Sequence, residues 1–129
     1  MDAGSTAPQS RKLGLRAGQR VSIVGADAGW TLVDPPALEY VDDGPADVVI
    51  AFLREAASVE GILVALGERI RPSGAIWAAW PRRAAGHVSD VGDAVIRGAV
   101  LPHGLVDVKV AAIDEDWSGL KLVWRLTQR

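Results

Sequence analysis

Three arginines stand at positions where a folded domain could hold an anion. Arg82 and Arg83 follow the apolar run 74–81, and Arg54 follows the apolar run 47–53. A guanidinium group forms paired hydrogen bonds with carboxylate and phosphate groups. These arginines therefore predict contact with a small anion, and the same residues would equally suit a solvated loop.

Five tryptophans are unusual in a chain that contains one phenylalanine and one tyrosine. Trp77 and Trp124 lie within apolar runs and are predicted to pack in the core. Trp30, Trp80 and Trp117 fall at the ends of predicted strands, where an aromatic side chain either lines a pocket or caps the core.

Three consecutive carboxylates, Asp114, Glu115 and Asp116, precede Trp117. Paired carboxylates can perform acid–base chemistry or hold a cation, but the tip of a hairpin is also commonly acidic for solubility. The second interpretation is favoured here, and Asp116 and Trp117 are kept as candidates for ligand contact.

Metal and thiol chemistry have little support in the sequence. His87 and His103 are the two histidines, and neither has a partner at ligand spacing. The chain contains no cysteine, which excludes disulfides and thiol catalysis. We expect no metal site and no resident cofactor.

The run 74–81 organises the predicted fold. It is apolar without a period of two and ends at Pro81. Such a strand is buried on both faces and belongs to a parallel sheet covered by helices. Because proline cannot donate to the ladder, the strand is predicted to end there and to release Arg82 and Arg83 at its carboxyl end.

Further strands are predicted at 20–24, 37–41 and 47–53. A helix is expected from Ser58, as its N-cap, to Ile70. A second helix is expected from Ser89 or Asp90 through about residue 100.

The C-terminal part alternates between apolar and polar residues over 106–113 and 120–126, with a short connection at 114–119. This pattern predicts an antiparallel hairpin. Lys109 in the first of these strands is typical of a protected sheet edge. The predicted order is strand 20–24, then 47–53, 74–81, 120–126 and 106–113, with 120–126 alone antiparallel.

Parallel strands bring their carboxyl ends to one edge of a sheet, where ligands commonly bind. The loops after three strands and the tip of the hairpin are therefore expected to meet there. The resulting ligand-contact prediction comprises Gly25, Asp27, Gly29, Trp30, Arg54, Trp80, Arg82, Arg83, Asp116 and Trp117.

Length and composition indicate one small domain. The chain has 129 residues, a net charge of -2 and 49% hydrophobic residues. We expect a disordered tail over 1–10 and a single domain over 11–129. No basic face predicts nucleic acid binding, and no apolar run reaches the roughly 18 residues that span a bilayer. A cytoplasmic protein is expected.

The order of these elements resembles the class I S-adenosylmethionine-dependent methyltransferase fold, shortened in its first half. The resemblance implies an α/β, Rossmann-like sheet and a Gly-x-Gly-x-Gly turn after the first strand. The matching positions here are Gly25, Asp27 and Gly29, so an aspartate replaces the middle glycine. In that family an acidic residue after the second strand holds the ribose, and Asp42 or Asp43 is at about the right distance.

A second resemblance is to a family of short bacterial proteins catalogued only as a domain of unknown function. The similar stretches are Lys12-Leu13-Gly14, 77–82, 104–110 and 114–120. Membership would support the fold and would imply no activity.

Two functions remain open. The preferred one is a non-catalytic module on a degenerate methyltransferase-like scaffold that binds a small anionic or aromatic ligand or a protein partner. The alternative is a small S-adenosylmethionine-dependent methyltransferase completed by oligomerisation. A homodimer is expected because strand 20–24 is predicted to lie near an exposed sheet edge.

Overall fold

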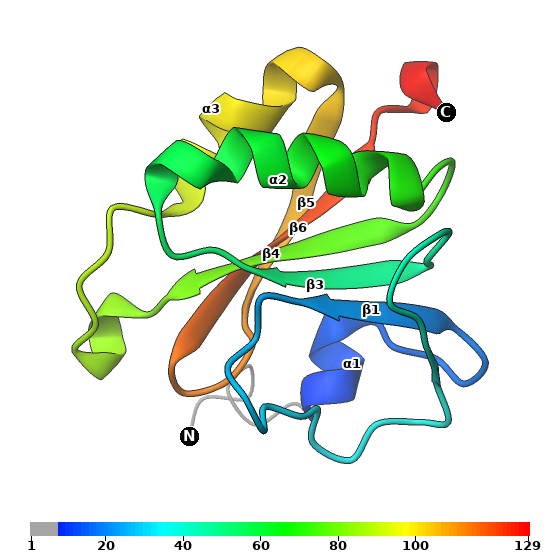
Figure 1. Cartoon of the computed structure of the whole chain (residues 1–129), viewed down its shortest axis with the longest axis horizontal. Coiled ribbons are helices and arrows are strands. Elements are labelled where there is room, and N and C mark those ends of the chain that lie inside the picture. The colour runs from blue at the N-terminus through cyan, green and yellow to red at the C-terminus, as the bar shows by residue number, and fades with distance from the viewer. Residues whose placement is uncertain (1–7) are drawn as a thin grey trace.

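The computed structural model describes residues 8–129 (Figure 1). Its centre is one six-stranded sheet in the order β2-β1-β3-β4-β6-β5. The strands are β1 (Arg20–Val24), β2 (Glu39–Tyr40), β3 (Val48–Phe52), β4 (Ala75–Pro81), β5 (Leu105–Ala112) and β6 (Trp117–Trp124). Within the described chain, β6 alone runs against the other strands. The predicted α/β fold class, the strand order and the interior position of β4 are confirmed.

Three α-helices accompany the sheet: α1 (Gln9–Leu13), α2 (Ala56–Arg69) and α3 (Asp93–Val100). Short 3-10 turns occupy η2 (Arg83–Ala85), η3 (Leu101–His103) and η4 (Leu126–Gln128). The predicted tail over 1–10 lies mostly outside the described residues, but its last part, Gln9 and Ser10, is helical. Among residues 8–129 no helix is long and apolar enough to cross a membrane.

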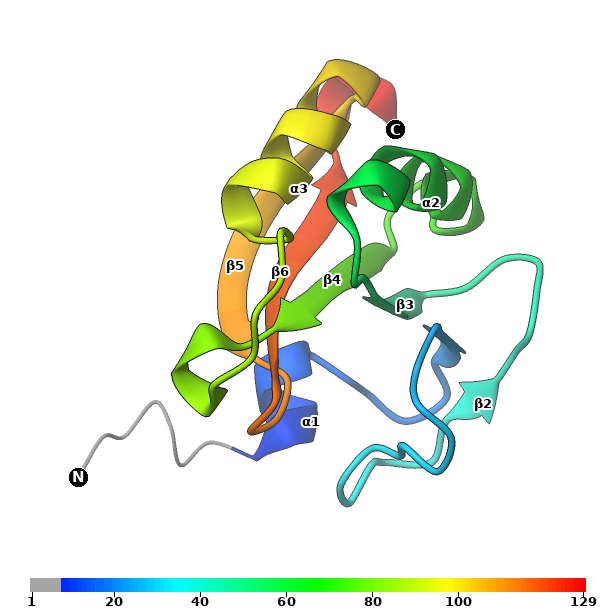
Figure 2. The same ribbon diagram turned by 60° about the vertical axis from the view of Figure 1, so that its left-hand side comes forward.

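The two faces of the sheet are covered differently (Figure 2). Helices α2 and α3 pack on one face, called the helical face here, against side chains such as Val49, Ile76 and Leu120. On the other face, called the second face, α1 and the loop 25–38 cover side chains such as Ile50 and Trp77. Trp77 and Trp124 are both buried, as predicted.

The starts of α2 and α3 differ from the prediction. Ser58 is not an N-cap, because α2 begins two residues earlier. Ser89 and Asp90 do not begin α3 either, because they bind the start of α2 and the loop before it. Ser89 Oγ donates to the Arg54 carbonyl oxygen (3.3 Å), and Asp90 Oδ1 accepts from the amide of Ala56, the first residue of α2 (2.9 Å). Propensity suggested helix starts at these residues, but their oxygens satisfy backbone groups of another segment.

The edges of the sheet also differ in part. The two-residue strand β2 lies outside β1 and pairs with Arg20 and Val21, so β1 is not the edge strand. Strand β1 still lies near the edge, as predicted, because β2 pairs with only two of its residues, and the homodimer stays a prediction. Strand β5 forms the opposite edge and carries Lys109, and its register with β6 shifts between Asp107 and Lys109. A lysine and an irregular register are the usual protection of an edge strand.

Candidate functional site

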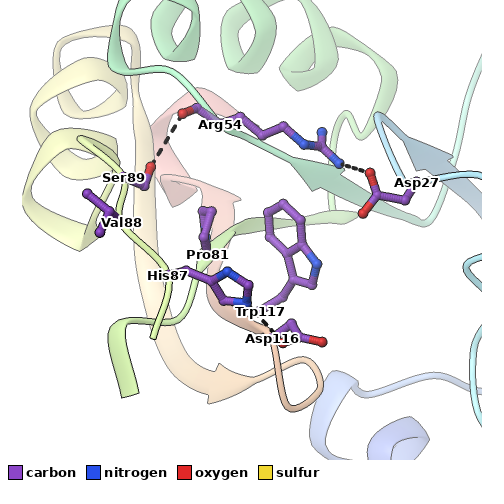
Figure 3. Close-up of a pocket in the computed structure, with 8 residues that line it drawn as sticks. All are labelled: Asp27, Arg54, Pro81, His87, Val88, Ser89, Asp116 and Trp117. Carbon is purple, nitrogen blue, oxygen red and sulfur yellow. Dashed lines mark hydrogen bonds and ion pairs between the residues drawn. The ribbon is translucent and has the colours of Figure 1, made fainter. Parts of the chain in front are cut away.

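The carboxyl ends of β1, β3 and β4 meet the tip of the β5–β6 hairpin at one edge of the sheet, as predicted. A cavity of about 440 Å³ opens there (Figure 3). We call it the edge cavity. It is lined by Asp27, Arg54, Pro81, His87, Val88, Ser89, Asp116 and Trp117.

Arg54 joins the loop after β1 to the hairpin. Its Nη1 donates to the Gly25 carbonyl oxygen (2.6 Å), and its Nη2 pairs with Asp27 Oδ1 (2.9 Å). The guanidinium carbon also lies 5.0 Å from the centre of the Trp117 ring. One cation thus holds together three segments that are distant in sequence: the loop after β1, the end of β3 and the hairpin.

An aromatic row supports this arrangement from the second face. Phe52 packs edge-on against both Trp30 and Trp117, with ring centres 4.8 Å apart in each pair. The Trp30 indole donates to Asp114 Oδ2 (2.9 Å), and Asp114 Oδ1 accepts from the backbone of the hairpin. Asp114 therefore shapes the hairpin and anchors Trp30, which is a structural role. Neither Trp30 nor Phe52 lines the edge cavity.

The loop 82–92 supplies the other wall of the edge cavity. His87 Nε2 lies 2.9 Å from Asp116 Oδ1, and Val88 next to it is 99% exposed. Ser89 ties this loop to the Arg54 backbone. The sequence prediction missed Pro81, His87, Val88 and Ser89 as lining residues. Their position in the loop after the central strand is the signal that could have identified them.

Gly25 and Gly29 have backbone angles that explain their identity. Their φ values are +76° and +84°. A Cβ atom on Gly25 would lie 2.9 Å from the Phe52 carbonyl oxygen, whereas one on Gly29 would meet open space. The predicted glycine turn is therefore present, and only Gly25 is required for a close backbone approach.

The charges of the edge cavity are largely balanced by one another. Two carboxylates, Asp27 and Asp116, face one guanidinium, Arg54, and one imidazole, His87. Each carboxylate already contacts one of the cationic or potentially cationic groups. The edge cavity thus offers both hydrogen-bond donors and acceptors and carries no excess of positive charge.

Four of the predicted residues, Asp27, Arg54, Asp116 and Trp117, line the edge cavity. Gly25, Gly29 and Trp30 do not line it, and neither do Trp80, Arg82 and Arg83. The last three line a second cavity of about 460 Å³. Trp80 packs with the core of the helical face, while Trp117 packs with the core of the second face. Trp80 pairs with Ser118 across β4 and β6, and Trp117 is the neighbour of Ser118 along β6. Because neighbouring residues of a strand point to opposite faces, Trp80 and Trp117 lie on opposite faces of the sheet.

The turn that contains Asp42 and Asp43 lies away from the edge cavity. The Gly44 carbonyl oxygen, directly after it, accepts from Arg69 Nε (2.8 Å) near the end of α2. The end of α2 is at the opposite edge of the sheet, where β3 begins, as the bond from the Ala46 amide to the Arg69 carbonyl oxygen confirms. The suggested ribose contact from Asp42 or Asp43 is therefore wrong.

Metal binding has no obvious location in residues 8–129, because no three His, Asp or Glu side chains gather there closely enough to hold an ion. All buried side-chain nitrogen and oxygen atoms of these residues have hydrogen-bond partners.

Comparison with known proteins gives structural relatives only. No family model matches the sequence, and no curated protein matches it, so membership of the bacterial family of unknown function stays a prediction.

Three solved structures illustrate the likeness. Magnesium protoporphyrin IX methyltransferase from Synechocystis PCC 6803, with bound S-adenosylmethionine, has a TM-score of 0.57 and 12% identity over 84% of this chain and 71% of that chain. A methyltransferase dependent on the same cofactor, from Aquifex aeolicus, has a TM-score of 0.56 and 11% identity over 87% of this chain and 85% of that chain. A chain of a fibrillarin/Nop5p complex has a TM-score of 0.55 and 12% identity over 86% of this chain and 75% of that chain.

At these identities the likeness establishes the fold and not the activity. Together with the strand order, it shows that this chain has the fold of S-adenosylmethionine-dependent methyltransferases.

Proposed function

We propose that this protein binds a small aromatic ligand in the edge cavity and does not itself transfer a methyl group. The observation that carries the proposal is the wall of the edge cavity: the Arg54 guanidinium lies over the Trp117 ring, and His87 and Asp116, which contact each other, line the same cavity. A concave site with an aromatic wall and a few convergent polar groups is the usual form of a small-molecule pocket.

The polar groups favour a planar ligand with both donors and acceptors. Arg54 donates, Asp27 and Asp116 accept, and His87 can do either according to its tautomer. Pro81 and the exposed Val88 add apolar surface. A heterocycle such as a nucleobase satisfies this set, because its edge carries donors and acceptors while its face suits apolar and aromatic contact.

Methyl transfer is disfavoured by the loop after β1. A cofactor carboxylate that approached this loop would meet the Asp27 carboxylate, and like charges held close together disfavour each other. Arg54 is also already bound to Asp27 and to the Gly25 carbonyl oxygen. S-adenosylmethionine would have to break these contacts of Arg54 in order to bind. Neither Asp42 nor Asp43 lies at this edge, so neither carboxylate can offset the loss by a hydrogen bond to the ribose of the cofactor.

The proposal is tested by a screen of small heterocycles, followed by calorimetry on the wild type and two variants of the cavity rim. Val88→Asp and His87→Ala change exposed side chains, so they should fold normally. Both should weaken binding by about tenfold or more, which corresponds to roughly 1.4 kcal/mol. Val33→Asp is the matched control, because Val33 is also exposed, at 61%, and does not line the edge cavity. Equal binding by all four proteins would place the ligand elsewhere.

The second candidate is a methyltransferase that a second copy of the chain completes. The comparisons favour it, because the Synechocystis relative holds S-adenosylmethionine on the same fold. This candidate predicts low-micromolar affinity for that compound and a dimeric mass by light scattering. A monomer without affinity would exclude it and leave the binding function in place.

A further inference from the structure

The second cavity opens at the same edge of the sheet but on the helical face, and we call it the arginine cavity. It has a volume of about 460 Å³ and is lined by Trp80, Arg82, Arg83, Ala84, Val91, Gly92, Asp93 and Ser118. Trp80 pairs with Ser118 across β4 and β6, and the next pair, Pro81 with Trp117, belongs to the walls of the edge cavity. The ends of β4 and β6 therefore separate the two cavities.

The two arginines of this cavity have no carboxylate partner within residues 8–129. The Arg82 side chain donates from Nη1 to the Glu115 carbonyl oxygen at 3.1 Å. No ion pair joins either arginine to a described acidic residue. Arg82 also borders a third cavity with Asp114 and Glu115, but neither carboxylate forms an ion pair with it.

The one carboxylate in the wall is already engaged. Asp93 Oδ2 accepts from Arg97 Nη1 (2.7 Å), and its other oxygen accepts from the Ala94 amide (3.0 Å). The arginine cavity thus has two guanidinium groups against one neutralised carboxylate. In the edge cavity two carboxylates face one guanidinium and one imidazole, so only the arginine cavity of the two carries an excess of positive charge.

We propose that the arginine cavity binds the phosphate group of a small phosphate ester, with Trp80 against its apolar part. Guanidinium groups match the oxygens of phosphate in geometry, and a phosphate dianion matches two of them in charge. The Ser118 hydroxyl supplies a further donor in the wall. The size of the cavity is that of a small-molecule site. This site is independent of the ligand proposed for the edge cavity.

The test uses phenyl phosphate and phenol, which share the ring and differ in the phosphate. Each is titrated into ¹⁵N-labelled protein while the Trp80 indole N–H signal, assigned with Trp80→Phe, is followed. Phenyl phosphate should shift this signal at concentrations where phenol does not. Arg83→Ala should weaken the binding by about tenfold. Arg82→Lys, which keeps the charge and the fold but loses the paired geometry, should weaken it less.

Two controls make the result decisive. Arg125→Ala removes an exposed cation that does not line the arginine cavity and should change nothing beyond a general salt effect. Asp27→Asn alters only the edge cavity and should also leave the binding unchanged, so failure of one proposal does not imply failure of the other. Unaltered binding in Arg83→Ala, or a shift of Trp117 in place of Trp80, would overturn the assignment.

Discussion

At the scale of single residues, Arg54 shows how one side chain can connect separate loops. It contacts the Gly25 carbonyl oxygen, Asp27 and the ring of Trp117. The sequence placed all four residues at one edge of the sheet, because each follows a strand or lies in the hairpin. It did not reveal that Arg54 already has an internal carboxylate partner, since this depends on the path of the loop after β1.

The contacts of Arg54 predict unequal costs for two substitutions. Asp27→Asn breaks a solvent-exposed ion pair, with 75% of the aspartate side chain accessible, and should lower the free energy of unfolding by less than about 1 kcal/mol. Arg54→Ala also removes the carbonyl contact and the stacking on Trp117, so it should cost more, about 1–2 kcal/mol. Urea unfolding of both variants measures the difference. A larger loss for Asp27→Asn than for Arg54→Ala would contradict this account of Arg54.

The Asp93–Arg97 pair predicts a pH dependence. The hydrogen bond from Arg97 holds the pKa of Asp93 below its ordinary value of 3.8. A carboxyl with a lowered pKa stabilises the fold above its unfolded pKa, and the stabilisation is lost as the pH falls through the folded pKa. The destabilisation caused by Asp93→Asn should therefore be constant between about pH 5 and pH 7 and should shrink below about pH 4. A difference that is the same across this range would contradict the prediction.

At the scale of elements, apolar runs identified the strands, while local propensity misplaced the helix starts. The runs at 20–24, 47–53 and 74–81 became β1, β3 and β4 within one residue. The signal is strongest for β3 and β4, because a strand buried on both faces must be apolar throughout. Ser89 or Asp90 was predicted to start α3, but Ser89 binds the Arg54 backbone and Asp90 binds the Ala56 amide. Such a bond between distant segments leaves no periodic signal in a sequence.

Two glycines at different elements give a matched pair of predictions. Gly74, before β4, is closely surrounded: an added Cβ would lie 2.8 Å from the Asp47 carbonyl oxygen and 2.9 Å from that of Ile70. Gly61, in α2, has open space around it. Gly74→Ala should destabilise the protein by about 1–3 kcal/mol, because backbone atoms must move. Gly61→Ala should stabilise it by about 0.5–1 kcal/mol through helix propensity. Thermal unfolding of the two variants measures whether each substitution raises or lowers the stability. A change in the same direction for both variants would contradict the packing described.

At the scale of the whole molecule, the sheet divides the predicted ligand residues into two groups. Sequence reasoning brought Trp80, Arg82 and Arg83 to the correct edge but united them with Trp117 and Arg54 in one site. The side-chain alternation of β4 and β6 instead assigns them to separate cavities on opposite faces. The topology of the strands was enough to predict the edge of the sheet at which these residues lie. To predict the face on which each one lies, the register of β4 with β6 is also needed, and the sequence does not specify that register.

The central claim is that the edge cavity of this methyltransferase-like fold binds a small aromatic ligand and not S-adenosylmethionine. The most direct test is a ¹H–¹⁵N NMR titration of the wild type with a set of small heterocycles and, separately, with S-adenosylmethionine. The account predicts that at least one heterocycle shifts the Trp117 indole signal and the amides of His87 and Val88, while S-adenosylmethionine leaves them unchanged. Saturable shifts at low-micromolar S-adenosylmethionine, or heterocycle shifts confined to the opposite edge around Gly104, would contradict it.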